Sequence, residues 1–341
     1  MSESSLTRPA RLQGGPPQQV VSRPASGAPT GNPALPPALA GQRRLIGGPG
    51  PLLCGYLSLP AQATAVGDAR RGHPLLLVHS VNAAASAAEV RPIFEALGVS
   101  RPVLALELPG FGSSERGPQH YTPALMRDSI LRALQHLRRS GLHRPADVLG
   151  VSLSAEFVTQ AALAQPDAVR SVALVSPTGL ESDDLERYEL GRTKDKPLLR
   201  GLLQRGPWAD PLYRLLTRES TMRKFLERAW GCKSIDEGLL AYKLLSAPQP
   251  GARFAPLDFV AGALSTRGAA HLYARLHQPV WLAHGTRGEF AKFDGIGRLG
   301  PPPRWRVDSF ETGAMPYFER PGEFVQRYEV FLQRVGGQAW R

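Results

Sequence analysis

The chain has 341 residues, of which 42% are hydrophobic, and a formal net charge of +12 at pH 7. Its length and hydrophobic content permit one large core with an insertion, or two domains. The excess charge is mostly arginine scattered along the chain, without a block of five like charges or a motif that contacts bases. We therefore expect no nucleic-acid partner.

The two cysteines, Cys54 and Cys232, do not have the spacing of a disulfide framework or a zinc site, which fits a reducing compartment. The first residues lack the charged and apolar segments of a signal peptide, and no apolar run approaches eighteen residues. We therefore predict a soluble cytoplasmic protein. The sequence gives no indication of its oligomeric state.

Residues 1–50 are roughly one-third proline and glycine and lack aromatic side chains. Such a segment cannot bury enough apolar surface to offset its chain entropy, so we predict a disordered tail over 1–50. We assign the rest of the chain to a core in two parts, 51–177 and 278–341, separated by an insertion at 178–277.

After the tail, short apolar runs alternate with longer segments of helical periodicity. This alternation is typical of an α/β fold, in which a mostly parallel sheet has helices on both faces. The predicted strands are 54–59, 74–79, 103–107, 147–150, 172–175, 280–284 and 305–310. The predicted helices are 87–97, 123–139, 154–165 and 323–335, and Thr122 is the expected N-cap of the second.

Within 178–277 the alternation stops, and leucine- and arginine-rich helical stretches follow one another without a convincing strand. These stretches are 198–203, 213–216, 222–230 and 237–245, and we predict that they form a helical cap. Basic amphipathic helices can also lie on membranes. A cap must likewise bury one leucine-rich face, and we expect cap packing here, not membrane contact.

The most informative motif is Gly150-Val151-Ser152-Leu153-Ser154, which lies where a predicted strand ends and a helix begins. A sharp turn there lifts a serine hydroxyl above the sheet, and small residues flank it because neighbouring segments pass close by. Three further stretches lie before and after this motif in the chain. They are the strand and loop at 74–82 with His79-Ser80-Val81-Asn82, the loop at 107–114 with Glu107-Leu108-Pro109-Gly110, and the strand at 172–179.

In order and spacing these stretches resemble the α/β-hydrolase superfamily, in its form with a helical cap, over about residues 51–337. The resemblance implies that Ser152 is the nucleophile and that the backbone N–H groups of Val81 and Leu153 form an oxyanion hole. The side-chain amide of Asn82 would add a donor. No metal-ligand or cofactor motif is visible, since Gly110-x-Gly112 lacks the rest of a dinucleotide site, and we expect neither.

The resemblance fails at the acid and the base. Members carry the acid in a G-x-x-D string after the strand at 280–284, where this chain has Gly288. Glu289, one place later, is the first candidate acid and Asp294 the second. Members carry the catalytic histidine in a loop that aligns with 312–321, and Ala314 stands at its position. The usual triad base is therefore missing.

Several residues are candidates to replace it. His284 ends a predicted strand and could face the site, although a packed structural histidine is the commoner case. Tyr317 could donate a hydrogen bond to a substrate, but a phenol with its ordinary pKa of about 10 is a poor base. Lys292 would need strong desolvation, and His79 is expected to stabilise the oxyanion loop.

Two functions follow from this pattern. The first is a serine-dependent hydrolase of a carboxylic ester or similar small acyl compound, with a non-standard base. The second is a catalytically inactive hydrolase-like protein that binds a small apolar ligand under its cap. A base within hydrogen-bond reach of Ser152 would favour the enzyme, and its absence would favour binding.

Overall fold

The computed structural model describes residues 35–60, 72–180, 192–293, 295–296 and 304–337. The chain divides into two units, 1–33 and 34–341. The first unit lies outside the described residues, and so does most of the predicted tail. The description below concerns the second unit.

Within the described residues, eight strands form one sheet in the order β1-β2-β4-β3-β5-β6-β7-β8. Strand β2 is antiparallel to β1 and β4, and all other neighbours are parallel. The strands are β1 (Gln42–Ile46), β2 (Leu53–Ser58), β3 (Leu75–Val78), β4 (Val103–Glu107), β5 (Ala146–Val151), β6 (Val169–Val175), β7 (Val280–Gly285) and β8 (Trp305–Phe310). The predicted α/β class with a mostly parallel sheet is confirmed.

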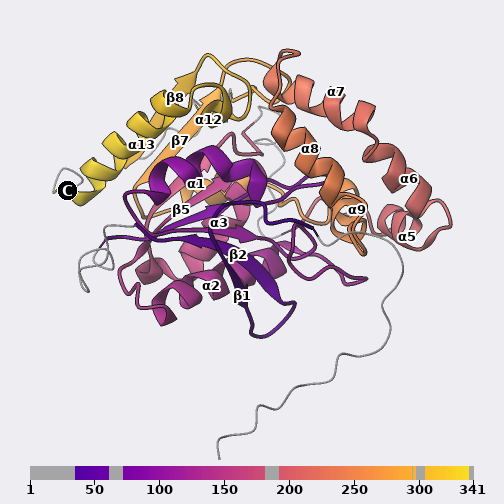
Figure 1. Ribbon diagram of the computed structural model, residues 1–341, viewed down its shortest axis with the longest axis horizontal. Helices are drawn as coiled ribbons and strands as arrows, with labels where there is room; N and C mark the ends of the chain where they lie inside the picture. The colour runs from indigo at the N-terminus through magenta and orange to yellow at the C-terminus, as the bar shows by residue number, and fades with distance from the viewer. Residues whose placement is uncertain (1–34, 61–71, 181–191, 294, 297–303, 338–341) are drawn as a thin grey trace, which may run out of the picture. The chain divides into compact units, whose positions relative to one another are not determined.

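Helices cover both faces of the sheet (Figure 1). One face carries α2 (Pro123–Arg139), α3 (Ser154–Ala164) and α10 (Ala269–Ala274), and the other carries α1 (Arg91–Gly98) and α13 (Pro321–Gly336). Three short helices complete these layers: η3 (Ala87–Val90), η4 (Pro166–Ala168) and α12 (Pro316–Glu319).

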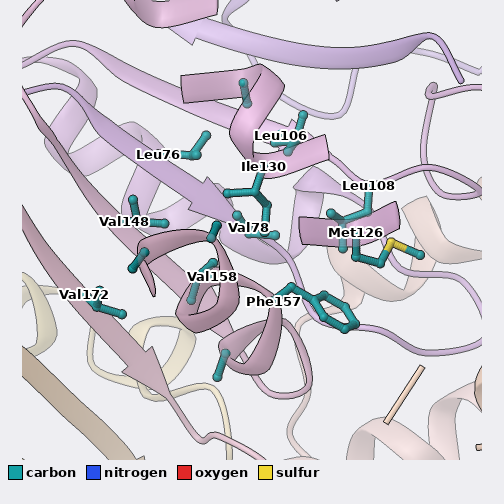
Figure 2. Close-up of a cluster of buried hydrophobic side chains, with 14 of the residues drawn as sticks. Leu76, Val78, Leu106, Leu108, Met126, Ile130, Val148, Phe157, Val158 and Val172 are labelled. Atoms are coloured by element: carbon teal, nitrogen blue, oxygen red, sulfur yellow. The ribbon is translucent and has the colours of Figure 1, made fainter. Parts of the chain in front are cut away.

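Because side chains alternate along a strand, each central strand contributes to two cores. Val148 and Val172 pack on the α2–α3 side, whereas the residues that follow them, Leu149 and Ala173, pack on the α1–α13 side. Figure 2 shows part of the first core, where α2 and α3 send Ile130 and Val158 toward the sheet. Strands buried on both faces explain the continuous apolar runs in the sequence.

Between β6 and β7 the chain forms a group of helices beside the sheet (Figure 1). They are α5 (Pro197–Arg205), α6 (Ala209–Leu216), α7 (Glu219–Trp230), α8 (Glu237–Ser246) and α9 (Phe254–Val260). We call α5–α9 the cap helices. Among the described residues no helix has both the length and the apolarity that crossing a bilayer requires.

One prediction is wrong at the end of the supposed tail. Residues Gln42–Ile46 form β1, which pairs with β2 along its whole length, from Gln42 opposite Leu57 to Ile46 opposite Leu53. Only Ile46 of this strand is buried. An edge strand of this kind is held by backbone hydrogen bonds that composition does not reveal.

Candidate active site

Ser152 lies in the turn between β5 and α3, at the carboxyl end of a central strand. Its φ of 53° is in the left-handed region, which is uncommon for a residue with a side chain. The Ser152 N–H donates to the Val175 carbonyl at 2.8 Å, and its carbonyl accepts from Ala155 at 3.0 Å. No described group forms a hydrogen bond with the Ser152 hydroxyl. The backbone of Ser152 is thus fixed, while its hydroxyl remains without a described partner.

Close packing explains the small residue at 150. A Cβ on Gly150 would lie 2.8 Å from both the Ser154 carbonyl oxygen and Val158 Cγ2, so glycine alone fits without a shift. Ser154, where members more often have glycine, is fully buried, and its hydroxyl donates to the His79 carbonyl at 2.5 Å. The predicted turn is therefore tied directly to the loop that follows β3.

The N–H groups of Val81 and Leu153 make no hydrogen bond with any described residue. Both residues are buried, where an unpaired N–H group is costly unless an acceptor arrives. Two such donors, one in the serine turn and one in the loop after the neighbouring strand β3, suit a carbonyl oxygen that becomes negative during acyl transfer. The oxyanion role expected of Val81 and Leu153 stays a prediction.

His79 fixes the backbone of this loop. Its Nε2 accepts from the Leu108 N–H at 3.1 Å, so Nδ1 carries the proton and donates to the Ser80 carbonyl at 2.6 Å. The ring is fully buried, and burial lowers its pKa, which keeps it neutral. His79 is thus committed to the loop and is not available as a base for Ser152.

Asn82 is not a free oxyanion donor, contrary to the prediction. Its amide group donates to Ser80 Oγ at 2.9 Å and to Glu89 Oε1 at 2.6 Å, so both hydrogens are used. Its oxygen accepts from the Ala84 N–H at 3.1 Å and from Lys243 at 3.1 Å. The amide therefore orders the loop instead of binding an oxyanion.

Ala314 stands beside the serine turn, in the loop between β8 and α12. Ser176, which follows Val175 at the end of β6, donates from its hydroxyl to the Ala314 carbonyl at 2.7 Å. The Ala314 N–H donates to the Ala229 carbonyl of α7 at 2.8 Å. The loop thus lies one strand away from Ser152, but it brings a methyl group and no base.

Glu289 does not face the serine. Both of its carboxylate oxygens pair with the guanidinium of Arg228 on α7, and its N–H donates to the Arg228 carbonyl at 3.2 Å. The Glu289 side chain is 47% exposed. Asp294, the second candidate acid, lies outside the described residues.

Neither candidate substitute base is hydrogen-bonded to Ser152, although the buried Tyr317 hydroxyl has no partner among the described residues. His284 Nδ1 lies 2.9 Å from the Gly285 carbonyl, and its ring packs 4.4 Å from that of Phe293, while burial lowers its pKa. Tyr317 is fully buried, and burial raises the pKa of its phenol well above the ordinary value. A phenol held neutral in this way cannot accept a proton from serine.

Sequence reasoning missed two features of the site. One is Ser176, whose φ of 44° is the second left-handed value of a non-glycine residue in the described chain. The other is a buried ion pair between Glu89 and Lys243 of α8. Lys243 lies three and four residues after the buried Leu240 and Leu239, so a charge on the apolar face of a helix was the available signal.

The described residues include no group of three or more histidine, cysteine or acidic side chains placed to hold a metal ion. The candidate site therefore consists of Ser152, the unpaired N–H groups of Val81 and Leu153, and the buried polar network around Asn82 and Glu89.

Comparisons with known proteins agree with the fold. The family model of the alpha/beta hydrolase fold matches residues 73–237. No curated protein sequence matches the chain significantly.

Solved structures resemble nearly the whole chain. A serine hydrolase involved in carbazole degradation is 13% identical, with a TM-score of 0.65 over 86% of this chain and 99% of its own. A thermophilic esterase from Thermogutta terrifontis is 20% identical, with a TM-score of 0.63 over 86% and 99%. A meta-cleavage product hydrolase from Pseudomonas fluorescens IP01 is 17% identical, with a TM-score of 0.62 over 86% and 98%. At these identities the likeness establishes the fold.

Proposed function

We propose that this chain, which has the α/β-hydrolase fold and matches the family model over residues 73–237, is a serine-dependent hydrolase of a small carboxylic ester or similar acyl compound, with Ser152 as nucleophile and a base other than a triad histidine. The observation that carries the proposal is that two features occur together. Ser152 has a left-handed backbone and a hydroxyl without a described hydrogen bond, and the N–H groups of Val81 and Leu153 are unpaired. A left-handed serine costs on the order of 1–3 kcal/mol and persists only where the surroundings enforce it.

In this proposal the substrate carbonyl oxygen lies between the Val81 and Leu153 N–H groups. As Ser152 Oγ bonds to the carbonyl carbon, that oxygen becomes negative, and each donor stabilises it by about 3 kcal/mol. Collapse of the intermediate breaks the bond to the leaving alkoxide, which takes a proton from water. Water or hydroxide then releases the acyl group from Ser152.

The proton of Ser152 needs an acceptor, and no described side chain forms a hydrogen bond with that hydroxyl. We therefore assign this role to solvent hydroxide. The consequence is a reaction whose rate rises steadily with pH, without the plateau that a histidine base gives above its pKa of about 6.5.

A second candidate function is binding without turnover. It is favoured by the absence, among the described residues, of a base hydrogen-bonded to Ser152, by the methyl group at Ala314 and by the pairing of Glu289 with Arg228. In this case the same two N–H groups would hold the carbonyl or carboxylate oxygen of a small ligand under the cap helices.

Labelling with a fluorophosphonate separates the two functions. We expect the purified protein to be labelled between pH 6 and pH 10, at a rate that increases with pH, and the Ser152→Ala variant to remain unlabelled. Mass spectrometry of the labelled peptide would place the adduct. If the protein is labelled no faster than Ser152→Ala at any pH, the hydrolase proposal fails and the binding function remains.

A further inference from the structure

A cavity of about 170 Å³ lies between the oxyanion loop and the cap helices. The loop contributes residues 82–84, and its other walls come from α6, α7, α8 and α9. Most of this lining is apolar and includes Leu216, Met222, Phe225 and Phe259. An apolar cavity of about 150 Å³ holds one benzene molecule, so this one fits a group of that size.

Lys243 brings a charge to the wall of this cavity. The residue is 3% exposed, and its ammonium group donates to Asn82 Oδ1 at 3.1 Å, to the Ala84 carbonyl at 3.4 Å and to Glu89. An ammonium has three hydrogens. All three are therefore directed at protein acceptors, and none remains for a ligand.

Glu89 is the counter-charge behind this wall. It is fully buried and accepts from the Ser80 N–H at 3.0 Å, from Ser80 Oγ at 2.7 Å and from Asn82 Nδ2 at 2.6 Å, in addition to Lys243. Burial alone would raise the pKa of Glu89, but the charge of Lys243 and the hydrogen bonds from Lys243 and Ser80 outweigh it and lower the pKa. The pair is thus ionised and has no net charge.

We propose that this cavity binds an uncharged apolar group of about the size of a benzene ring, and that Glu89 excludes carboxylates from it by cancelling the charge of Lys243. The inference depends on the proposed function at one point: it treats the apolar group in the cavity as part of the substrate of the hydrolase. A carboxylate that entered would lose its hydration, find no free donor on Lys243 and approach a second buried anion.

The inference makes Glu89 the residue that sets ligand charge. In a Glu89→Gln variant the ammonium of Lys243 loses its counter-ion and becomes able to bind a carboxylate. A Glu89→Gln/Lys243→Met double variant removes both charges and keeps the cavity neutral. It is the matched control, because it shares the loss of Glu89 without exposing a cation.

Binding can be measured by fluorine NMR with 4-fluorobenzyl alcohol and 4-fluorobenzoate. In the Ser152→Ala background, which prevents any acyl chemistry, we expect the alcohol to bind at least about tenfold more tightly than the carboxylate. Glu89→Gln should bring the carboxylate to equal or tighter binding. The double variant should again prefer the alcohol.

A complementary variant covers the case in which Glu89→Gln does not fold, since the new amide would face the donors of Ser80 and Asn82. Lys243→Met leaves Glu89 as the unpaired charge, and we expect it to bind 4-fluorobenzylamine at least about tenfold more tightly than the double variant does.

Two results would overturn the inference: equal binding of alcohol and carboxylate by the parent protein, or a folded Glu89→Gln protein that binds the carboxylate no better. Its failure is distinguishable from failure of the proposed function. If the protein is labelled at Ser152 but binds no alcohol, only the inference about the cavity fails. If it binds the alcohol but is never labelled, only the proposed hydrolase function fails.

Discussion

At the scale of single residues, the site depends on backbone positions more than on side-chain identity. Two positions define the serine turn: Gly150, whose neighbours leave no room for a Cβ, and Ser152, whose backbone is left-handed. Both proposed oxyanion donors, the N–H groups of Val81 and Leu153, are main-chain groups. This explains why Ser80, Val81 and Leu153 can differ from common family residues while the donors remain in place. The departures that matter are therefore at Ala314 and Gly288, where the chemistry needs a side chain.

Restoring a base at position 314 should activate the serine. Both backbone groups of Ala314 are held, the N–H by Ala229 and the carbonyl by Ser176, so the position is fixed one strand from Ser152. A general base is worth about 10²- to 10⁴-fold, and one without an orienting acid should give less. We expect Ala314→His to raise the rate of fluorophosphonate labelling at pH 8 by about 10- to 100-fold.

The matched control is Ala314→Asn, which adds a polar side chain without a base. The rate in Ala314→His should also follow a titration near the ordinary imidazole pKa of about 6.5, a dependence absent from the control. A rate no higher than that of the asparagine variant would show that position 314 does not address Ser152.

Glu289 should prove dispensable, although the sequence made it the first candidate acid. Its carboxylate is engaged by Arg228, and it has no hydrogen bond with Ser152 or with a described histidine. We therefore expect Glu289→Gln to leave the labelling rate within about twofold of the parent, as should the partner variant Arg228→Gln. A drop of tenfold in Glu289→Gln alone would return Glu289 to the role of the catalytic acid.

At the scale of elements, apolar periodicity predicted most of the sheet and its helices. Strand β4 and helix α2 have the predicted bounds, and the predicted N-cap Thr122 accepts from the Leu125 N–H at 3.2 Å. Strand β1 was missed because its pairing with β2 leaves little trace in a polar edge strand. Elements with a buried face were predictable, and an edge held by backbone bonds was not.

The same division applies to the site. The serine turn and the oxyanion loop are each contiguous in sequence, so short motifs located them. The ion pair between Glu89 and Lys243 joins residues 154 positions apart, and no local pattern links them. The contact of the 312–315 loop with α7 is likewise a tertiary feature, which neither the helix nor the loop indicates alone.

That contact gives a test of how the cap helices are attached. A Cβ on Gly313 would overlap the backbone of Ala229 and Trp230 at the end of α7. Gly313→Ala must therefore push the loop away from the helix, and overpacking of this kind costs about 1–3 kcal/mol. We expect the urea concentration at the midpoint of unfolding to be lower for Gly313→Ala than for the parent by a corresponding amount.

Gly322→Ala is the control for this substitution, because a Cβ there meets nothing within 4 Å and the residue lies inside α13. It should leave stability unchanged or increase it by up to about 1 kcal/mol. Equal effects of the two variants would mean that the loop and α7 are not in close contact.

At the scale of the whole molecule, three buried glutamates of the described chain respond differently to pH. Lys243 keeps the pKa of Glu89 low, whereas burial raises the pKa of Glu107 and of Glu156 to about 7 in each case. Glu156 accepts from Thr178 Oγ1 and from the Thr266 N–H, both at 2.7 Å, and so joins α3 to the segments on either side of the cap helices.

The raised pKa values predict the pH dependence of folding. An unfolded glutamate titrates near 4.5 and Glu156 near 7, so the folded protein binds more protons between these values. Its stabilisation is complete below about pH 4.5 and is lost as pH rises through 7. We expect the free energy of unfolding, measured with urea, to fall between pH 5 and pH 8. Glu156→Gln should be more stable than the parent at pH 8.

The amide in Glu156→Gln stays neutral and retains both hydrogen bonds, since its oxygen can accept from Thr266 and its NH₂ can donate to Thr178. The difference between pH 5 and pH 8 should therefore shrink by up to about 3 kcal/mol, the equivalent of the pKa shift. Glu107 remains in the variant and is expected to preserve part of the fall. A variant whose stability drops as steeply as that of the parent would show that Glu156 is ionised throughout, and that the junction it forms is held by a charge.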